Sequence, residues 1–168
     1  MPDKKTEKRK GEHVDIVLQS KVQYGLATGL EQVRFEHCPL PELAIGKTDA
    51  SCNFFKKRLR LPFMITGMTG GYGSAWEINK SLAAVCEEKK IVFGLGSQRA
   101  MLENRSLEYT YMVREAAPTV FLCANIGANQ LAKYDKNGEL GKIGAMVERT
   151  DADAICVGTE LDQTVSHE

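Results

Sequence analysis

The sequence lacks several features that would assign it to a class at once. It has no run of about 18 apolar residues, the minimum for a membrane-spanning helix, and no apolar signal-peptide core near its start. Neither charge is in excess, with 22 basic and 22 acidic side chains among 168 residues, whereas nucleic-acid-binding domains usually carry a basic excess. We therefore expect a cytoplasmic protein that binds neither membrane nor nucleic acid.

Cysteine and histidine are also too few and too scattered to indicate a disulfide framework or a zinc site. The cysteines number five, an odd count, and no C-x-x-C pair occurs. The three histidines are not spaced with them as ligand pairs. This pattern is typical of buried, reduced thiols in a reducing compartment.

Residues 1–60 are less regular than the rest and are interpreted as an N-terminal extension. The first 13 residues carry five cations against three acids, which fits either a solvated, frayed terminus or an arm that binds an anion. Residues 14–33 are mixed, with a helix followed by a loop as one interpretation. Residues 53–60 predict a short strand pair with Phe54 and Phe55 packed inward.

Residues 61–168 form the second predicted domain, in which short apolar runs alternate with helical patterns up to residue 157. The runs predict buried strands at 61–67, 91–96, 120–125 and 154–157. Helices are predicted at 75–88, where Ser74 and Glu77 resemble a capping box, at 107–117, and after the Asn137-Gly138 turn. Their expected apolar faces are Ile78, Leu82, Val85 and Cys86; Tyr109, Met112, Val113 and Ala116; and Leu140, Ile143, Gly144 and Val147.

Strand starts about 30 residues apart predict an α/β fold with a parallel sheet. A doubly wound sheet and a (β/α)8 TIM barrel both fit this rhythm. A complete barrel needs about 250 residues, so a barrel interpretation makes this chain its first four βα units. The unpaired strand edges of such a half-barrel must pair with something, and we expect a homo-oligomer.

The polar and glycine-rich stretches all follow strands, where parallel α/β folds bind their ligands. They are TGMTGGYGS (66–74), GSQR (96–99) and ANIGANQ (124–130). The glycines allow close backbone approach to a flat or anionic ligand. Arg99 is suited to a phosphate, and Asn125 to the edge of a heteroaromatic ring, although each stretch alone also fits an ordinary turn. GLGSQR lacks the third glycine of a dinucleotide-binding loop, so a Rossmann site is poorly supported.

Four strings in this order and spacing resemble the type 2, FMN-dependent isopentenyl-diphosphate isomerase family, whose members are complete FMN-binding barrels. The strings are RKGEH (9–13), PFMITGMTGG (62–71), GLGSQRAML (94–102) and ANIGANQL (124–131). The resemblance runs from about residue 7 to 157 and corresponds to the N-terminal half of a family member.

The resemblance implies roles for the residues at matching positions. Flavin-contacting positions would be Thr66, Gly67, Met68, Thr69, Ser97 and Asn125. Diphosphate-contacting positions would be Arg9, Lys10, His13 and Arg99, with Ser97 and Gln98 beside them. It also implies a 1,3-proton shift that interconverts isopentenyl and dimethylallyl diphosphate, with reduced FMN, NADPH as reductant, and Mg²⁺ bound with the diphosphate.

The sequence departs from the family pattern after the fourth predicted strand. GTELDQT (158–164) stands where the family carries a segment like HLNPxQE, so that Gln163 falls on the substrate-facing glutamine and Thr164 replaces the metal-binding glutamate. Three hypotheses remain open at this stage. The chain is a flavin isomerase that needs its other half, a non-catalytic truncated remnant, or part of another FMN barrel such as a 2-hydroxy-acid oxidase.

Overall fold

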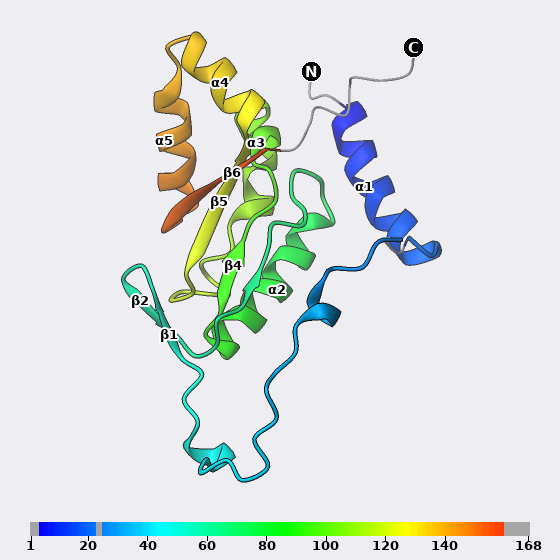
Figure 1. Cartoon of the computed structure of the whole chain (residues 1–168). Helices are drawn as coiled ribbons and strands as arrows, with labels where there is room; N and C mark the ends of the chain where they lie inside the picture. Colours follow the sequence, from blue (N-terminus) through cyan, green and yellow to red (C-terminus); the bar gives the residue numbers. More distant parts are fainter. Residues whose placement is uncertain (1–3, 23–24, 160–168) are drawn as a thin grey trace.

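The computed structural model describes residues 4–22 and 25–159. Among these residues, no helix is both long and apolar enough to cross a membrane. The chain begins with a helix, continues through a long, mostly irregular stretch to a hairpin, and ends in alternating strands and helices (Figure 1). The elements are α1 (Lys4–Gln19), η1 (Leu30–Gln32), η2 (Ile45–Lys47), β1 (Cys52–Phe54), β2 (Lys57–Leu59), β3 (Met64–Ile65), α2 (Ala75–Lys89), β4 (Val92–Gly94), α3 (Arg99–Glu103), η3 (Arg105–Tyr111), β5 (Leu122–Gly127), α4 (Ala128–Lys136), α5 (Leu140–Arg149) and β6 (Ala154–Gly158).

The sheet confirms the predicted α/β class with a parallel sheet. Strands β3, β4, β5 and β6 lie side by side in chain order, and each pair is parallel. Each predicted strand is present, although β3 is reduced to Met64–Ile65. The four strands close no barrel.

The two faces of the sheet are covered differently. Leu122, Ala124 and Ile126 of β5 join the larger core with buried residues of α2, α3, η3 and α5. The intervening Phe121 and Cys123 pack in a smaller cluster with the β1–β2 hairpin. Helices therefore lie on one face, as right-handed crossovers that all step in one direction require. A doubly wound sheet would carry helices on both faces, so the described residues argue against that alternative.

The antiparallel hairpin predicted at 53–60 is confirmed, with Phe54 opposite Lys57 in the register. Phe54 packs in the smaller cluster, as predicted. Phe55 does not pack inward, since it is 76% exposed. It occupies the turn with a φ of 50°. Its ring stacks on Phe121, with centroids 5.4 Å apart, and meets the Phe54 ring edge-on, with centroids 5.0 Å apart.

Two predictions about α2 need correction. Ser74 adopts helical dihedral angles and its side chain caps nothing, so the predicted capping box does not form. The buried face agrees only in part with the predicted one. Cys86 is buried and Leu82 packs against the larger core, as predicted. The other buried residues are Ala75, Asn79 and Ala83, and Val85 is 44% exposed. The buried Asn79 is polar, so this face does not show the continuous apolar pattern from which a buried helix face is predicted.

The helix predicted at 107–117 is wrong. Residues 107–111 instead belong to the 3-10 helix η3, and 112–117 form no helix. Helix η3 begins after α3, where the Asn104 side chain accepts a hydrogen bond from the Ser106 backbone N–H at 3.1 Å. Thr110 and Tyr111 are buried at its end. Helix α4 was not predicted, since its polar sequence offers only Leu131 and Tyr134 to the core. In α5, Ile143 is buried as expected, whereas Leu140 is 47% exposed.

The thiols are free, as expected, but not all are buried. Cys86 and Cys123 are buried and Cys38 is exposed. Burial, followed by the neighbouring Cys156 thiol, raises the pKa of Cys123 to about 12. The buried thiols are therefore protonated and unreactive at neutral pH.

Glu87 joins the end of α2 to the residue that leads into β5. Its carboxylate accepts hydrogen bonds from the Thr119 backbone N–H at 2.8 Å and from the Lys90 ammonium at 2.5 Å. Burial opposes ionisation, but these hydrogen bonds outweigh it and lower the pKa of Glu87 from 4.5 to about 2. A carboxyl group with a lowered folded-state pKa stabilises the fold above its unfolded pKa and loses that contribution as the pH falls.

We therefore expect stability to fall between about pH 4.5 and pH 2, and Glu87→Gln to flatten this dependence. The variant should lose about 1–2 kcal/mol at pH 7 and much less near pH 2.5. Urea midpoints at a series of pH values would measure both. Glu88→Gln is the control, because that side chain is 70% exposed. Equal pH slopes for the wild type and Glu87→Gln would contradict the assignment.

Candidate functional site

The candidate site lies at the carboxyl ends of three neighbouring strands. Loops that begin at Thr66 and Leu95 follow β3 and β4 directly, whereas β5 runs into α4 at Ala128 without a loop, so that the predicted stretch 124–130 lies in the end of β5 and the start of α4. Because these strands are parallel and adjacent, their carboxyl ends meet at one edge of the sheet. The predicted convergence of the three stretches is therefore present.

The first two loops cross with almost no space between their backbones. A Cβ atom on Gly67 would lie 2.2 Å from the Leu95 carbonyl oxygen. A Cβ atom on Gly96 would lie 2.5 Å from the Thr69 carbonyl oxygen. Glycine at both positions is required by this close approach, which places the β3 loop directly against the β4 loop.

Buried side chains hold the β3 loop from below. The Asn79 side chain of α2 donates to the carbonyl oxygens of Thr69 at 3.2 Å and Thr110 at 2.8 Å. The Gly71 backbone N–H donates to the Thr110 hydroxyl at 2.9 Å. Asn79 and Thr110 are almost completely buried. Because buried polar groups are costly to leave unpaired, these contacts fix the loop in one conformation.

Gln98 ties the β4 loop to β5. Its backbone N–H donates to the Asn125 carbonyl at 2.8 Å, and its side-chain Oε1 accepts from the Asn125 N–H at 2.9 Å. Its Nε2 lies 3.2 Å from the Met101 sulfur. Gln98 is fully buried. The predicted substrate-side residue therefore lies in the interior, where it holds the loops together.

The accessible side chains at this edge of the sheet, here called the mouth of the site, combine apolar, polar and cationic groups. Met68 is 70% exposed and Thr66 is exposed, whereas Ser97 and Asn125 are partly buried. Arg99 begins α3, and its side chain is 30% exposed and 3.6 Å from the Glu103 carboxylate. A partly exposed pair at this distance is a weak restraint. Thr69 is largely buried, and only its backbone carbonyl has a described partner.

Comparison with known proteins identifies relatives of one kind. The chain is 44% identical over 153 residues to an isopentenyl-diphosphate delta-isomerase of Aeropyrum pernix, an alignment that covers 90% of this chain and 40% of the relative. A protein of the same name from Pyrococcus furiosus is 40% identical over 89% of the chain, and one from Archaeoglobus fulgidus is 42% identical over 90%. The chain is homologous to part of an isopentenyl-diphosphate delta-isomerase.

The match is extensive on this chain and partial on its relatives. It spans 39% of the Pyrococcus furiosus isomerase and 43% of the Archaeoglobus fulgidus isomerase. No family model matches the sequence. The family resemblance read from the four sequence strings thus agrees with the names of the relatives, while the isomerases themselves are about two and a half times as long as the matched region.

Not all residues that the isomerase resemblance singles out are at the sheet edge. His13 is exposed on α1, which also carries Arg9 and Lys10, whose side chains lie outside the described part of the structure. Figure 1 draws α1 apart from the sheet, at the end of the long stretch that leads to the hairpin. Ile16, Val17 and Leu18 on this helix are 50–78% exposed. Gln163 and Thr164 also lie outside the described residues.

Asn79, Thr110 and Tyr111 support the site and were missed at the level of sequence. Asn79 did leave a signal, since it is a polar residue spaced four positions from Ala75 and Ala83 on the buried face of α2. Thr110 and Tyr111 left none, because their segment was assigned to a regular helix. Their role depends on the irregular path of η3, which helical periodicity cannot reveal.

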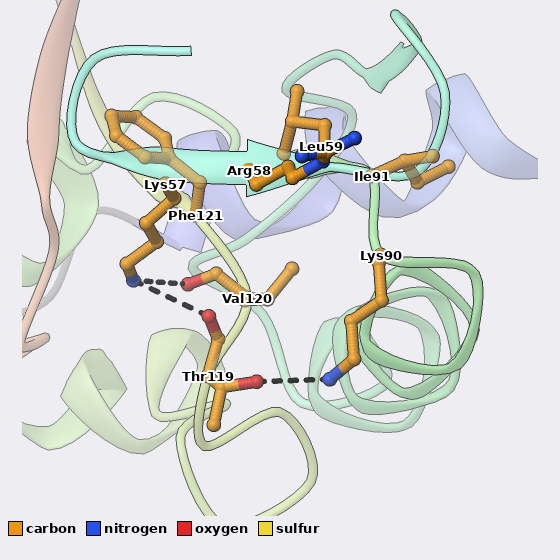
Figure 2. A pocket seen from close by; sticks show the side chains of 8 residues that line it. All are labelled: Lys57, Arg58, Leu59, Lys90, Ile91, Thr119, Val120 and Phe121. Atoms are coloured by element: carbon orange, nitrogen blue, oxygen red, sulfur yellow. Dashed lines mark hydrogen bonds between the residues drawn. The ribbon is translucent and has the colours of Figure 1, made fainter. Parts of the chain in front are cut away.

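A small pocket lies at the opposite end of the strands, and the side chains around it hold neighbouring elements together. Figure 2 shows Lys57, Arg58 and Lys90 around it, together with the residues that enter β4 and β5. Lys57 donates to the Val120 carbonyl at 3.0 Å and pairs with Asp153, while Lys90 pairs with Glu87. Arg58 pairs with Asp49. Because each cation already has an acidic partner, this pocket is not a promising anion site.

Proposed function

We propose that this chain supplies one side of a type 2, FMN-dependent isopentenyl-diphosphate delta-isomerase site. The observation that carries the proposal is the joining of the β3 loop, the β4 loop and the end of β5 at the carboxyl ends of the three strands. The similarity to isopentenyl-diphosphate delta-isomerases over 89–90% of the chain supports the substrate class. The substrate and product would be isopentenyl and dimethylallyl diphosphate.

The side chains at the mouth fit a flavin ring. The exposed Met68 offers a polarizable apolar surface. The Thr66 hydroxyl and the Asn125 side-chain amide offer donors and acceptors for the edge of a heteroaromatic ring. The close approach at Gly67 and Thr69 holds the β3 loop against the β4 loop, so that a flat group can lie over it. Ser97, at the end of the neighbouring loop, is the remaining proposed flavin contact.

The cationic residues fit a diphosphate. Arg99 lies beside the flavin-contacting loop, with its guanidinium restrained only weakly by Glu103. Arg9, Lys10 and His13 on α1 would complete charge-assisted hydrogen bonds to the substrate if α1 closes over the sheet edge. The chain's residues would then bind the diphosphate, orient the isopentenyl group and exclude water. Reduced flavin, with NADPH as the source of electrons, would supply proton transfer for the 1,3-shift.

The described residues do not themselves form a magnesium site. Within residues 4–22 and 25–159, no three histidine, cysteine, aspartate or glutamate side chains are grouped as metal ligands. We therefore derive no step through Mg²⁺, which in this proposal arrives with the diphosphate. Gln163, the proposed substrate-facing glutamine, stands outside the described part of the chain.

The remaining length of the relatives fits completion of a barrel. Helices on one face, strands in chain order and a hairpin on the opposite face support the interpretation of this sheet as part of a (β/α)8 barrel. Ile155 and Val157 of β6 are 38% and 44% exposed, as expected for a strand whose next neighbour is not among the described residues. We propose that a cytoplasmic assembly, with further βα units or further copies of this chain, covers them.

The first test is a flavin titration of the purified chain, read from quenching of FMN fluorescence. We expect saturable binding by a discrete species, and about equal affinity for FMN and riboflavin, because the proposed contacts are to the ring system. Met68→Ala should weaken binding about threefold to tenfold, equivalent to about 1 kcal/mol of lost contact. Val85→Ala is the control, since that exposed residue lies on α2.

The second test supplies the part that the relatives have beyond the match. The complementary portion of the Aeropyrum pernix isomerase, mixed with this chain under reducing conditions with FMN, NADPH and Mg²⁺, should convert isopentenyl diphosphate to dimethylallyl diphosphate. A folded, FMN-containing complex that gives no product would reject the proposal. Oxidation of a 2-hydroxy acid by the same complex would replace it with an oxidase.

A further inference from the structure

We propose that Tyr111, at the end of η3, is a positioning residue that sets the β3 loop, the β4 loop and the end of β5 relative to one another in the candidate site. It lies outside the glycine-rich stretches, and its segment was assigned to an ordinary helix. The inference rests on the proposed function, because the ligand positioned is the proposed flavin.

The ring of Tyr111 determines where the β3 loop lies. A Cβ atom on Gly70 would be 2.0 Å from Cε1 of the ring and 2.5 Å from Cζ. Residue 70 can therefore be only glycine while the ring stays in place. Tyr111 itself is fully buried, so the ring has no room to move away. The height of the Gly70–Gly71 backbone at the site is thus set by the aromatic ring beneath it.

The hydroxyl of Tyr111 determines the orientation of a peptide in the β4 loop. It donates to the Ser97 carbonyl oxygen at 2.8 Å. The N–H of this same peptide belongs to Gln98 and donates to the Asn125 carbonyl at 2.8 Å. The peptide is therefore held at both ends, and rotation about it would break two hydrogen bonds. One phenol thereby connects Ser97 to Asn125, two of the proposed flavin contacts.

Tyr111 is suited to this role because it stays protonated. Burial raises its pKa far above the ordinary value, although the nearby Arg99 guanidinium opposes the rise. The hydroxyl is therefore a hydrogen-bond donor throughout the physiological pH range.

The test is Tyr111→Phe, which keeps the ring under Gly70 and removes the hydroxyl that donates to Ser97. We expect the FMN dissociation constant to rise about fivefold to tenfold, as for loss of one buried hydrogen bond. Amide exchange at Gln98 and Asn125 should accelerate at least about fivefold, while exchange at β5 positions in the larger core, such as Leu122, stays unchanged. Tyr109→Phe is the matched control, because that ring is on the same 3-10 helix and 48% exposed.

The outcomes separate this inference from the proposed function. If the wild type binds no FMN, the proposed function fails for this chain, and the positioning role fails with it; if the wild type binds FMN, the Tyr111→Phe results decide the positioning role alone. Faster exchange at Gln98 and Asn125 with an unchanged FMN affinity would overturn the inference, because Tyr111 would then be only structural. Unchanged exchange, or a uniform acceleration across the sheet, would overturn it as well.

Discussion

Replacing Gly67 with alanine is expected to destabilise the chain by about 3 kcal/mol and to abolish flavin binding. The added methyl would lie 2.2 Å from the Leu95 carbonyl oxygen and 2.9 Å from its carbon. Both are backbone atoms of the residue after β4, so no flexible side chain can move aside. The β3 loop would have to lift off the β4 loop, which separates Thr66 and Met68 from Asn125. Urea unfolding and FMN titration would measure the two effects.

The control for this prediction is Gly144→Ala on α5. A Cβ atom there would contact nothing within 4 Å, and the residue is exposed in the helix interior. Alanine should stabilise the fold by about 0.5–1 kcal/mol through its better helix propensity. The same substitution is thus expected to destabilise the fold at Gly67 and to stabilise it at Gly144. A mild effect of Gly67→Ala, within about 0.5 kcal/mol of the wild type, would mean that the loops do not cross as the structure describes.

The sequence was sufficient to predict the sheet and insufficient to predict what supports the site. The apolar runs ending near Ile65, Gly94 and Asn125 form strands, and β4 and most of β5 are buried because continuous hydrophobic segments of this length suit a parallel sheet covered by helices. Strand β3 was also expected to be buried, but Met64 is exposed and Ile65 is only partly buried. Their spacing implied crossovers, and the glycine-rich stretches after them were correctly expected at one edge. These features depend on local composition and on the regular geometry of βα units, which a sequence expresses directly.

The supports depend instead on contacts between distant residues. Asn79 and Thr69 are ten positions apart, and Gln98 and Asn125 are 27 apart. Nothing in the local pattern shows that the polar atoms of Gln98 are used inside the protein, so it was expected at the substrate. The helix predicted over 107–117 failed for a related reason. Val113 is buried because it packs on the core from an irregular segment, not because it lies on a helical face.

At the opposite end of the sheet, Asp153→Asn is expected to destabilise the chain by about 2–3 kcal/mol. Its carboxylate pairs with Lys57 of the hairpin at 2.8 Å and with Arg114 at 3.0 Å, and it accepts the Leu122 backbone N–H at 2.9 Å. An asparagine can keep the bond to Leu122 but removes the negative charge between two cations. Only 25% of the side chain is exposed, so water replaces these contacts poorly.

Loss of the Asp153 carboxylate should first weaken the packing of the hairpin on the sheet, because Lys57 is the charged contact of the hairpin with the sheet. Cys123 lies beneath the hairpin and is only 3% exposed, whereas Cys38 is exposed. Labelling of Cys123 by a thiol reagent should therefore accelerate about tenfold or more in Asp153→Asn, as expected when local opening becomes easier by at least 1.4 kcal/mol. The rate at Cys38 should not change and provides the internal reference.

The matched control is Asp151→Asn, which removes a carboxylate 3.4 Å from the same Arg114. Its side chain is 84% exposed, so the change should cost less than about 0.5 kcal/mol and leave Cys123 labelling unaltered. Burial opposes ionisation of Asp153, but the bonds from Lys57, Leu122 and Arg114 prevail and lower its pKa below 3.8. The difference in the free energy of unfolding between the wild type and Asp153→Asn should therefore be largest at neutral pH and become smaller as the pH falls below about 4. Equal effects of the two substitutions would mean that Arg114 and Lys57 hold the hairpin without Asp153.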